Sequence, residues 1–445
     1  MTALLQHQAL TPSLPPCSIK RSEQGIRNAA SSAARAELLL TQQAGYLEAE
    51  AGERSARFTQ SLICKNVDEN TRRKQIDLKL TELGPYRHAM SRNGRYMLLG
   101  GRLGHVSSMD WQAGRLEFEI NVRETVRDVV YLHNHTMVAA AQRKYVYIYD
   151  NTGAEVHCLR SHVEPNRLQF LPFHFLLASV GNAGYLKYQD VSTGQLVAEL
   201  RTKYGRCDVM RHNPFNAVMC LGHGNGVCTM WSPTVSTPLV KLLCHKGPVL
   251  SLAVDDSGLY LATAGIDRQM SIWDVRTFKP LHSYIMHRPC TTLDVSQRGL
   301  LACGFGSHVE IWKDALSSKQ KEPYLSHHFA GGEVVEALRF VPYEDVLGCG
   351  HSSGFSSFIV PGSGEPNFDA FEANPFESSK QRREAEVHSV LEKLQPDMIA
   401  LDAQFVGKVD RAPSEVIAGD TRTWAQARNL ETLTKRTSNL HQTQP

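Results

Sequence analysis

Between about residue 76 and residue 361 the chain repeats one pattern of apolar and polar positions. Each unit has a short apolar run, a turn of small residues, and a second run in which apolar and polar residues alternate, as in adjacent β-strands. The units close, at spacings of 40, 40, 42, 42, 39 and 47 residues, on Asp110, Asp150, Asp190, Ser232, Asp274, Lys313 and Val360. A period in this range is typical of propeller blades, so we expect an all-β, seven-bladed β-propeller over residues 76–361.

The fifth unit, "LATAGIDRQMSIWD", resembles a WD repeat. The resemblance implies that four side chains form one hydrogen-bonded chain that holds the blade together. These are His245, Thr263, Asp267 and Trp273. A catalytic triad of His245, Asp267 and Thr263 is the alternative, but it accounts for only three of the four residues. We therefore expect a structural tetrad in a WD-type propeller.

Three glycine-rich runs could suggest phosphate-binding loops: "GGRLGH" (residues 100–105), "GHGNG" (222–226) and "CGHSSG" (349–354). A phosphate loop leads into a helix N-terminus, whereas each of these runs leads into alternating residues such as "VCTMW". We interpret them as hairpin turns. No paired carboxylates, activated nucleophile or metal-ligand spacing stands out, so we expect no catalytic residues, no cofactor and no metal, and hence no enzyme.

The N-terminal extension, residues 1–75, begins with Pro- and Gln-containing sequence that suggests disorder. Residues 31–58 are richer in helix formers, and Leu38–Leu40 could dock on another surface. We expect this extension to be partly helical or disordered. The basic run of residues 72–74, "RRK", is typical of a solvated linker.

After the repeats comes "GEPNFDAFEANPFESSKQRR", residues 364–383, which differs in character from the strands before it. Its Asn and Pro residues favour extended or turned backbone. Its phenylalanines are too apolar for a free linker, so we expect them to dock on this propeller or on a partner. The candidate docking residues are Phe368, Phe371, Asn374, Pro375 and Phe376.

A helix follows within this segment. Ser378 and Gln381 have the spacing of a capping box, and Pro396 ends the pattern. One apolar stripe is expected along it: Val387, Leu391 and Leu394. The basic residues of its first turn lie where the helix dipole disfavours cations, which points to an anionic partner, although a solvated basic face explains them equally well. They are Lys380, Arg382 and Arg383.

The net charge of +3 is spread along the chain. Residues 1–75 hold ten Lys/Arg against seven Asp/Glu, residues 411–445 hold five against three, and residues 76–410 therefore come to about −2. No segment has the dense positive field of a non-specific nucleic-acid binder, so any RNA contact uses local patches or partners. The ten cysteines form no C-x-x-C pair, and no signal peptide or membrane-length apolar run is present. We expect a soluble intracellular protein.

Residues 364–402, placed directly after a degenerate WD propeller, resemble the nucleolar WD-repeat proteins with a BING-type C-terminal domain, which are subunits of the small-subunit processome. Propeller segments such as "NPFNAVMCLGHGNG" and "YEDVLGCGHSSG" resemble the same family. The resemblance implies a scaffold in the nucleolus of the nucleus that supports folding and cleavage of the 18S rRNA precursor. The implied partners are other processome proteins, pre-rRNA and small nucleolar RNA, with no membrane and no small-molecule substrate.

The same resemblance implies a BING-type segment at residues 362–410 whose phenylalanines anchor it and whose basic cluster faces RNA phosphate or an acidic protein. Residues 411–445 are expected to be a disordered tail. Family members commonly continue into a Lys/Arg-rich tail, whereas residues 424–445 here are only mildly basic.

A rival function comes from "IWDVR", residues 272–276. It matches the WD-x-Arg pattern of propellers that serve as substrate receptors of cullin-type ubiquitin ligases, with Arg276 presented to the ligase adaptor. The pattern occurs once here, whereas such receptors often show it in two adjacent blades.

Overall fold

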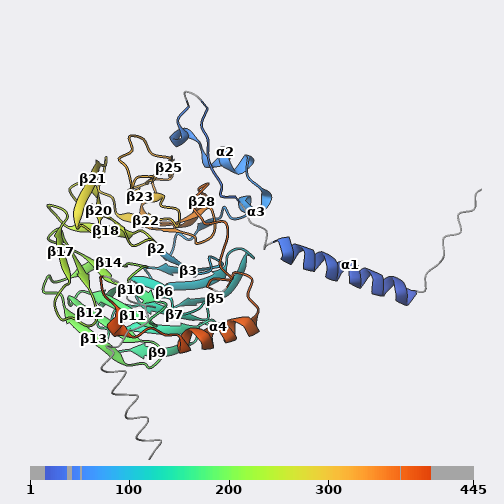
Figure 1. Ribbon diagram of the computed structural model, residues 1–445, viewed down its shortest axis with the longest axis horizontal. Helices are drawn as coiled ribbons and strands as arrows, with labels where there is room; N and C mark the ends of the chain where they lie inside the picture. Colours follow the sequence, from blue (N-terminus) through green and yellow to red (C-terminus); the bar gives the residue numbers. More distant parts are fainter. Residues whose placement is uncertain (1–15, 38–42, 51–52, 371, 402–445) are drawn as a thin grey trace, which may run out of the picture. The chain divides into compact units, whose positions relative to one another are not determined.

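The computed structural model describes residues 16–37, 43–50, 53–370 and 372–401. Its strands form seven four-stranded antiparallel sheets, which confirms the seven-bladed propeller (Figure 1). The first strand of each blade lies innermost, and the seven innermost strands contact one another in a closed ring.

The blades are built in chain order. Blade 1 holds β2 (Tyr86–Met90), β3 (Tyr96–Gly101), β4 (His105–Asp110) and β5 (Arg115–Asn121); blade 2 holds β6 (Asp128–Tyr131), β7 (Met137–Ala141), β8 (Val146–Asp150) and β9 (Glu155–Leu159). Blade 3 holds β10 (Pro165–Leu171), β11 (Leu176–Gly181), β12 (Tyr185–Asp190) and β13 (Leu196–Arg201); blade 4 holds β14 (Cys207–His212), β15 (Met219–His223), β16 (Val227–Trp231) and β17 (Val240–Leu243). Blade 5 holds β18 (Val249–Val254), β19 (Tyr260–Gly265), β20 (Gln269–Asp274) and β21 (Lys279–Ile285); blade 6 holds β22 (Thr292–Val295), β23 (Leu301–Phe305), β24 (His308–Trp312) and β25 (Leu325–His328).

The ring closes in blade 7, where the two ends of the propeller sequence meet. This blade joins β26 (Val335–Phe340), β27 (Val346–His351) and β28 (Gly354–Ile359) to β1 (Asp77–Lys79), which comes from the start of the chain. Asp77 pairs with Ser356 in register, and its carboxylate accepts a hydrogen bond of 2.8 Å from the Ser356 hydroxyl. The outermost strand of the last blade therefore precedes the first blade in sequence, and it fastens the ring.

Burial explains the hydrophobic pattern of the repeats. A second strand such as β11 or β19 is covered by neighbouring blades on both faces, so its sequence is a continuous run of apolar and small residues. An outer strand such as β13 is mostly exposed. Packing of blade against blade is thus the main source of stability.

Blade 5 contains the hydrogen-bonded chain expected of a WD repeat. His245 Nδ1 lies 3.1 Å from Asp267 Oδ1 and its Nε2 lies 2.9 Å from Thr263 Oγ1. Trp273 Nε1 donates to the same hydroxyl oxygen at 3.2 Å. All four side chains find partners within the blade, so their polar groups have a structural explanation.

The glycine-rich runs lie in strands and the hairpin turns between them. Gly226, for example, has φ +80° in the turn between β15 and β16. A Cβ there would lie 2.0 Å from the carbonyl oxygen of His245, so only glycine fits. These runs lead into strands and not into helix N-termini.

The N-terminal extension contains helix α1 (Pro16–Glu37), which begins inside the stretch whose composition suggests disorder. Its Ala-rich second half favours a helix. Leu38–Leu40 lie outside the described residues. Three short helices follow: η1 (Ser55–Arg57), α2 (Gln60–Lys65) and α3 (Glu69–Arg72).

Helix α2 is attached to blade 7. Ile63 and Cys64 are buried in the core shared by blades 6 and 7. The Gln60 side-chain amide accepts from Ile359 N at 3.0 Å and donates to Ile359 O at 3.1 Å, so it pairs with β28 as a strand would. Among the described residues, no helix is long and apolar enough to span a bilayer.

Candidate functional site

Residues 362–399, here called the C-terminal strap, run across one face of the propeller. This face carries the loops between the first and second and between the third and fourth strands of each blade, and we call it the strap face. The strap starts beside blade 7, where Gly364 N donates to Asp345 Oδ1 at 2.9 Å. Glu365 N then donates to Gln297 Oε1 in blade 6 at 3.3 Å.

The strap next crosses blade 1, where two arginines of the β2–β3 loop hold it. Arg95 donates to the carbonyl oxygen of Pro375 at 2.9 Å while its Nε donates to Asp110 Oδ2 at 2.8 Å. Arg92 forms an ion pair with Glu372. Ala373, between these contacts, is buried. Blade 1 therefore binds two groups of the strap, the backbone carbonyl of Pro375 and the carboxylate of Glu372.

The candidate docking residues divide into two groups. Pro375 is buried and Asn374 is half-buried, with its Oδ1 accepting from Phe376 N at 2.9 Å in a local turn. The rings of Phe368 and Phe376 pack together with centroids 6.1 Å apart, and Phe376 remains 50 % exposed. Phe371 lies outside the described residues. The described phenylalanines thus form an aromatic pair that still presents apolar surface.

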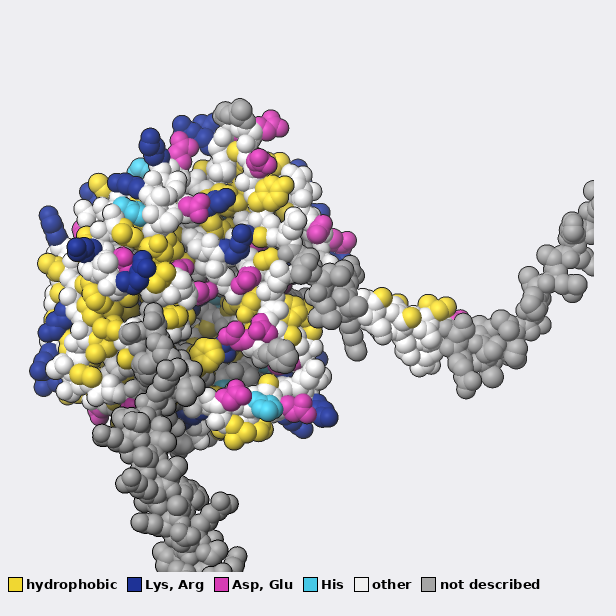
Figure 2. All heavy atoms as spheres, viewed as in Figure 1, with side chains coloured by type: hydrophobic (Ala, Val, Ile, Leu, Met, Phe, Trp, Pro, Cys, Tyr) yellow, Lys and Arg dark blue, Asp and Glu magenta, His cyan; other side chains and the backbone are white. Residues whose placement is uncertain are grey.

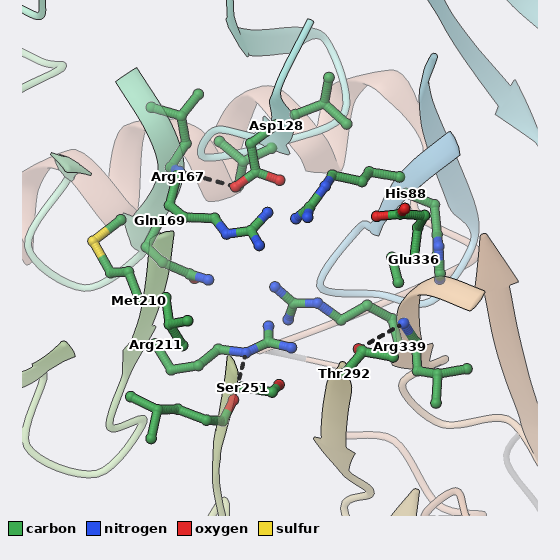
Figure 3. Close-up of a pocket in the computed structure, with 18 of the residues that line it drawn as sticks. His88, Asp128, Arg167, Gln169, Met210, Arg211, Ser251, Thr292, Glu336 and Arg339 are labelled. Atoms are coloured by element: carbon green, nitrogen blue, oxygen red, sulfur yellow. Dashed lines mark hydrogen bonds between the residues drawn. The ribbon is translucent and has the colours of Figure 1, made fainter. Parts of the chain in front are cut away.

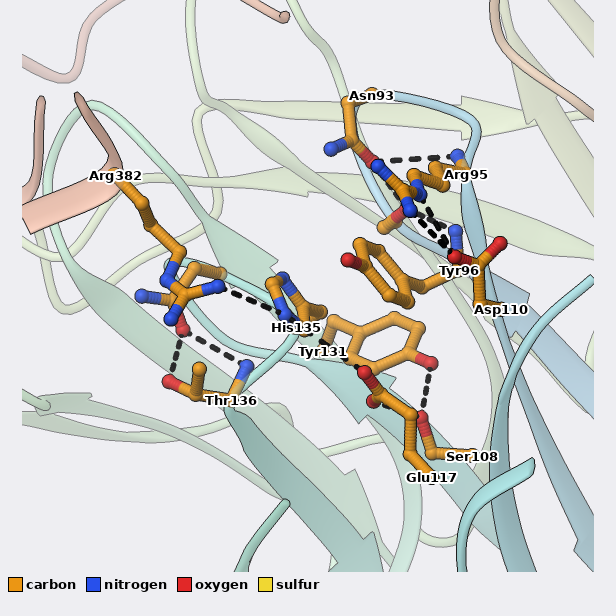
Figure 4. Close-up of polar contacts among 12 residues, drawn as sticks. Asn93, Arg95, Tyr96, Ser108, Asp110, Glu117, Tyr131, His135, Thr136 and Arg382 are labelled. Carbon is orange, nitrogen blue, oxygen red and sulfur yellow. Dashed lines mark hydrogen bonds and ion pairs between the residues drawn. The ribbon is translucent and has the colours of Figure 1, made fainter. Parts of the chain in front are cut away.

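Helix α4 (Ser379–Leu391) lies beside blade 2 (orange-red in Figure 1). The capping box is present: Ser378 accepts from Gln381 N, and the Gln381 side chain accepts from Ser378 N. On the side that faces the propeller, Glu386 Oε1 lies 3.0 Å from His133 Nε2, and Arg382 reaches His135 (Figure 4). The helix is therefore attached by polar contacts to the β6–β7 loop.

The contact of Arg382 with His135 requires a neutral imidazole. Arg382 Nη1 donates to His135 Nε2 at 3.3 Å, and the His135 ring stacks on Tyr96 at 3.7 Å (Figure 4). Burial, together with the neighbouring charges of Arg382 and Arg95, lowers the pKa of His135 to about 4. The imidazole therefore accepts this hydrogen bond at neutral pH.

The strap ends in blades 3 and 4. Lys393 pairs with Asp190 and donates to Ser192 Oγ at 2.9 Å, and Leu394 N donates to Phe173 O at 2.9 Å. Burial alone would raise the pKa of Asp190, but the hydrogen bonds from Lys393 and Ser192 hold it below its usual value.

The last contact is the deepest. After the short helix η2 (Pro396–Met398), Ile399 is 1 % exposed and lies in the core cluster shared by blades 3, 4 and 5. Its carbonyl oxygen accepts from Ser232 Oγ at 2.6 Å. The strap therefore ends on an apolar anchor.

The structure separates the predicted basic cluster. Arg382 contacts His135 within the chain, whereas the side chain of Lys380 is 88 % exposed and Arg383 is also exposed.

The expected apolar stripe of α4 is largely exposed to solvent, with Val387 60 % and Leu391 77 % exposed. On the face seen in Figure 2, basic and acidic side chains are interspersed and apolar side chains gather in patches. The outer side of α4 thus offers cations and apolar groups together.

The propeller residues that hold the strap carry no motif that marks them in the sequence. They are Arg92, Arg95, His133, His135, Asp190 and Ser232. The signal that the sequence offers for them is their position: all lie in loops of the strap face or at the strand end beside such a loop, at recurring places in the repeat. Arg276, the basis of the rival function, lies in the β20–β21 turn and is hydrogen-bonded to Asp274 at 2.9 Å.

Two domain families match this chain. The WD domain, G-beta repeat, matches residues 236–274, and the BING4CT (NUC141) domain matches residues 323–402. The second match includes β26, β27 and β28 of blade 7 as well as the strap. The fold and its strap therefore define a WD-repeat propeller protein whose C-terminal segment is bound across one face.

Relatives cover most of the chain. U3 small nucleolar RNA-associated protein 7 of Saccharomyces cerevisiae is 48 % identical over 89 % of this chain and 75 % of its own length. WD repeat-containing protein 46 is 47 % identical in Mus musculus, over 88 % of this chain and 63 % of the relative. In Homo sapiens it is 48 % identical, over 85 % of this chain and 62 % of the relative. The chain thus spans three quarters of the yeast relative and just under two thirds of the mammalian ones.

This chain belongs to the family of U3 small nucleolar RNA-associated protein 7 and WD repeat-containing protein 46. The resemblance seen in residues 364–402 is confirmed. The relatives give no support to the alternative of a ligase receptor.

Proposed function

We propose that this protein is a non-catalytic scaffold subunit of the nucleolar small-subunit processome, where it supports folding and cleavage of the precursor of small-subunit (18S) rRNA. The observation that carries the proposal is the 48 % identity to U3 small nucleolar RNA-associated protein 7 over 89 % of the chain, which includes the propeller and the strap. Its site of action on this proposal is the nucleolus.

The architecture supports a scaffold. A closed ring of seven sheets is a rigid disc, and the strap crosses several of its blades, so partner-binding groups on the strap keep fixed positions. We assign partner docking to the exposed apolar groups of the strap, namely Phe376, Val387 and Leu391, together with the half-buried Phe368 that packs against Phe376. Phe371, Asn374 and Pro375 belong to the same docking segment, with Asn374 and Pro375 setting its turn.

Lys380 and Arg383 are assigned to an anionic partner, either RNA or an acidic protein, because both are exposed and the one printed contact, between Lys380 and Glu384, is a solvent-exposed ion pair. Arg382 supports them by fixing α4 to His135. The partners on this proposal are other processome proteins, pre-rRNA and small nucleolar RNA.

Affinity purification tests the proposal. Tagged full-length chain, expressed in cells and recovered from extract, should enrich U3 small nucleolar RNA and small-subunit pre-rRNA over an unrelated WD propeller with the same tag. The unrelated propeller controls for non-specific binding of RNA to propeller surfaces. Equal recovery of these RNAs by both proteins would refute the proposal.

A further inference from the structure

The face opposite the strap face has a cavity of about 460 Å³ at the mouth of the central channel. It is lined by loops and strand ends of blades 1 to 4, together with Glu336 of blade 7. Its lining includes six arginines against two carboxylates, Asp208 and Glu336. The arginines are Arg87, Arg102, Arg127, Arg143, Arg167 and Arg206.

These arginines are incompletely neutralised by the protein. Arg206 pairs with Asp208 at 2.8 Å, and Arg127 donates to Asn166 Oδ1 at 2.8 Å. The side chains of Arg102 and Arg143 are exposed, and within the described part of the chain they make no hydrogen bond or ion pair. The cavity therefore keeps an excess of positive charge and guanidinium groups that are available to a ligand.

Positive charge continues inward along the channel. Arg87, Arg167 and Glu336 also line a second cavity of about 70 Å³, and Arg167, Arg211 and Arg339 extend into it (Figure 3). Arg211 is paired with Asp294 at 3.2 Å. Burial, together with the charge of the neighbouring Arg339, lowers the pKa of Arg211 to about 10. An anion at the mouth would relieve this crowding of like charges.

We infer that this arginine-lined mouth binds the phosphate groups of a single RNA strand, an inference that rests on the proposed function. The guanidinium groups come from successive blades, so they form an arc that fits a polymer with repeated phosphates. Arginine forks match phosphate oxygens with two parallel hydrogen bonds. A positively charged groove that follows the backbone is the usual way in which proteins hold single strands.

The rest of the lining favours RNA over an acidic peptide. Of the fourteen lining residues, the apolar side chains are those of Pro85 and Val126, whereas peptide recognition generally uses apolar pockets for anchoring side chains. Asn166 and Asn182 add amides that suit ribose and phosphate. Among the described residues that line the cavity there is no Phe, Tyr or Trp, so we expect contacts to the backbone with little preference for base sequence.

The test compares two variants of the full chain with equal loss of charge. Arg102→Gln with Arg143→Gln alters the mouth at exposed, unpaired positions. The control, Arg115→Gln with Arg276→Gln, alters exposed turns of the strap face. Binding of a fluorescent 20-nucleotide single-stranded RNA of mixed sequence is measured by anisotropy over a range of salt concentrations, with competition by inorganic phosphate and by oligoglutamate.

The mouth variant should bind the RNA about tenfold more weakly, with the slope of log K against log[salt] reduced by about 1.4 for two lost phosphate contacts. The control should bind like wild type. Equal binding by all three proteins would overturn the inference. Complete displacement of the RNA by millimolar phosphate would assign the mouth to a small anion, and displacement by oligoglutamate at equal charge concentration would assign it to an acidic protein; either result overturns it.

Particle association separates this inference from the proposed function. If wild type co-purifies with U3 small nucleolar RNA but the mouth variant binds purified RNA normally, only the present inference fails. If wild type does not co-purify, the proposed function fails, whatever the binding of purified RNA.

Discussion

The end of the strap gives a quantitative prediction, because its anchor is a single buried side chain. Ile399 is 1 % exposed, and Ile399→Ala leaves its main-chain contact with Ser232 in place. Truncating a buried Ile to Ala costs about 2–5 kcal/mol. Since the strap end can detach without unfolding the ring, this cost should appear as easier local opening.

An opening free energy that falls by about 3 kcal/mol raises the detached population about 100-fold, because about 1.4 kcal/mol is a factor of ten. Hydrogen exchange of peptides covering residues 392–399, read by mass spectrometry, measures this population directly. The amide of Leu394, which donates to Phe173 O, is the most informative probe.

The matched control is Leu391→Ala, since Leu391 is 77 % exposed in the same strap. Exposed positions of this kind change stability by about 0.5 kcal/mol or less. Similar exchange in the two variants, or an increase of less than about fivefold for Ile399→Ala, would refute the claim that the strap is anchored there.

Three further outcomes are expected. Thr263→Val leaves His245 Nε2 and Trp273 Nε1 without their shared partner, so the urea midpoint should fall by an amount equivalent to about 1–3 kcal/mol for each unpaired group, and a wild-type midpoint would contradict the tetrad's structural role. The pKa of His135 is lowered from 6.5 to about 4 in the folded chain, so the unfolded chain binds more protons between these values; the stability is full above about pH 6.5 and should be lost towards pH 4, and a flat urea midpoint over this window would be inconsistent with a buried neutral His135. Arg276→Ala should leave particle association unchanged, as measured by recovery of U3 small nucleolar RNA, whereas loss of a co-purified ligase adaptor would revive the rival function.

The propeller could be predicted from sequence because its signal is local and repeated. The apolar strands and turns of each blade are encoded within about forty consecutive residues, and the unit around Trp273 contains a recognisable tetrad. The capping box of Ser378 and Gln381 was predictable for the same reason, since its partners are three residues apart.

The route of the strap could not be predicted, because its partners are distant in sequence. Arg95 contacts Pro375 across 280 residues, and Ser232 contacts Ile399 across 167. Only the closed ring brings these loops to one face. The basic residues of α4 look equivalent in sequence, yet Arg382 turns inward to His135 while Lys380 points to solvent.

The arginine-lined mouth could not be predicted from sequence for a related reason. Its arginines are spread over 120 residues, from residue 87 to residue 206, in a stretch that mixes fifteen Lys/Arg with ten Asp/Glu, so no dense basic run marks them. They occupy equivalent positions in the repeat, either at the start of a first strand or in the turn between the second and third strands. The closed ring brings these positions together at one mouth of the central channel. Charge density along the chain therefore underestimates charge density in space.

Sedimentation of the tagged full-length chain from cell extract tests the central claim most directly. Gradient fractions, with and without RNase treatment, are probed for the protein, U3 small nucleolar RNA and small-subunit pre-rRNA. A processome scaffold should sediment in a large particle together with these RNAs and should move to lighter fractions after RNase. A small species whose position RNase does not change would contradict the account.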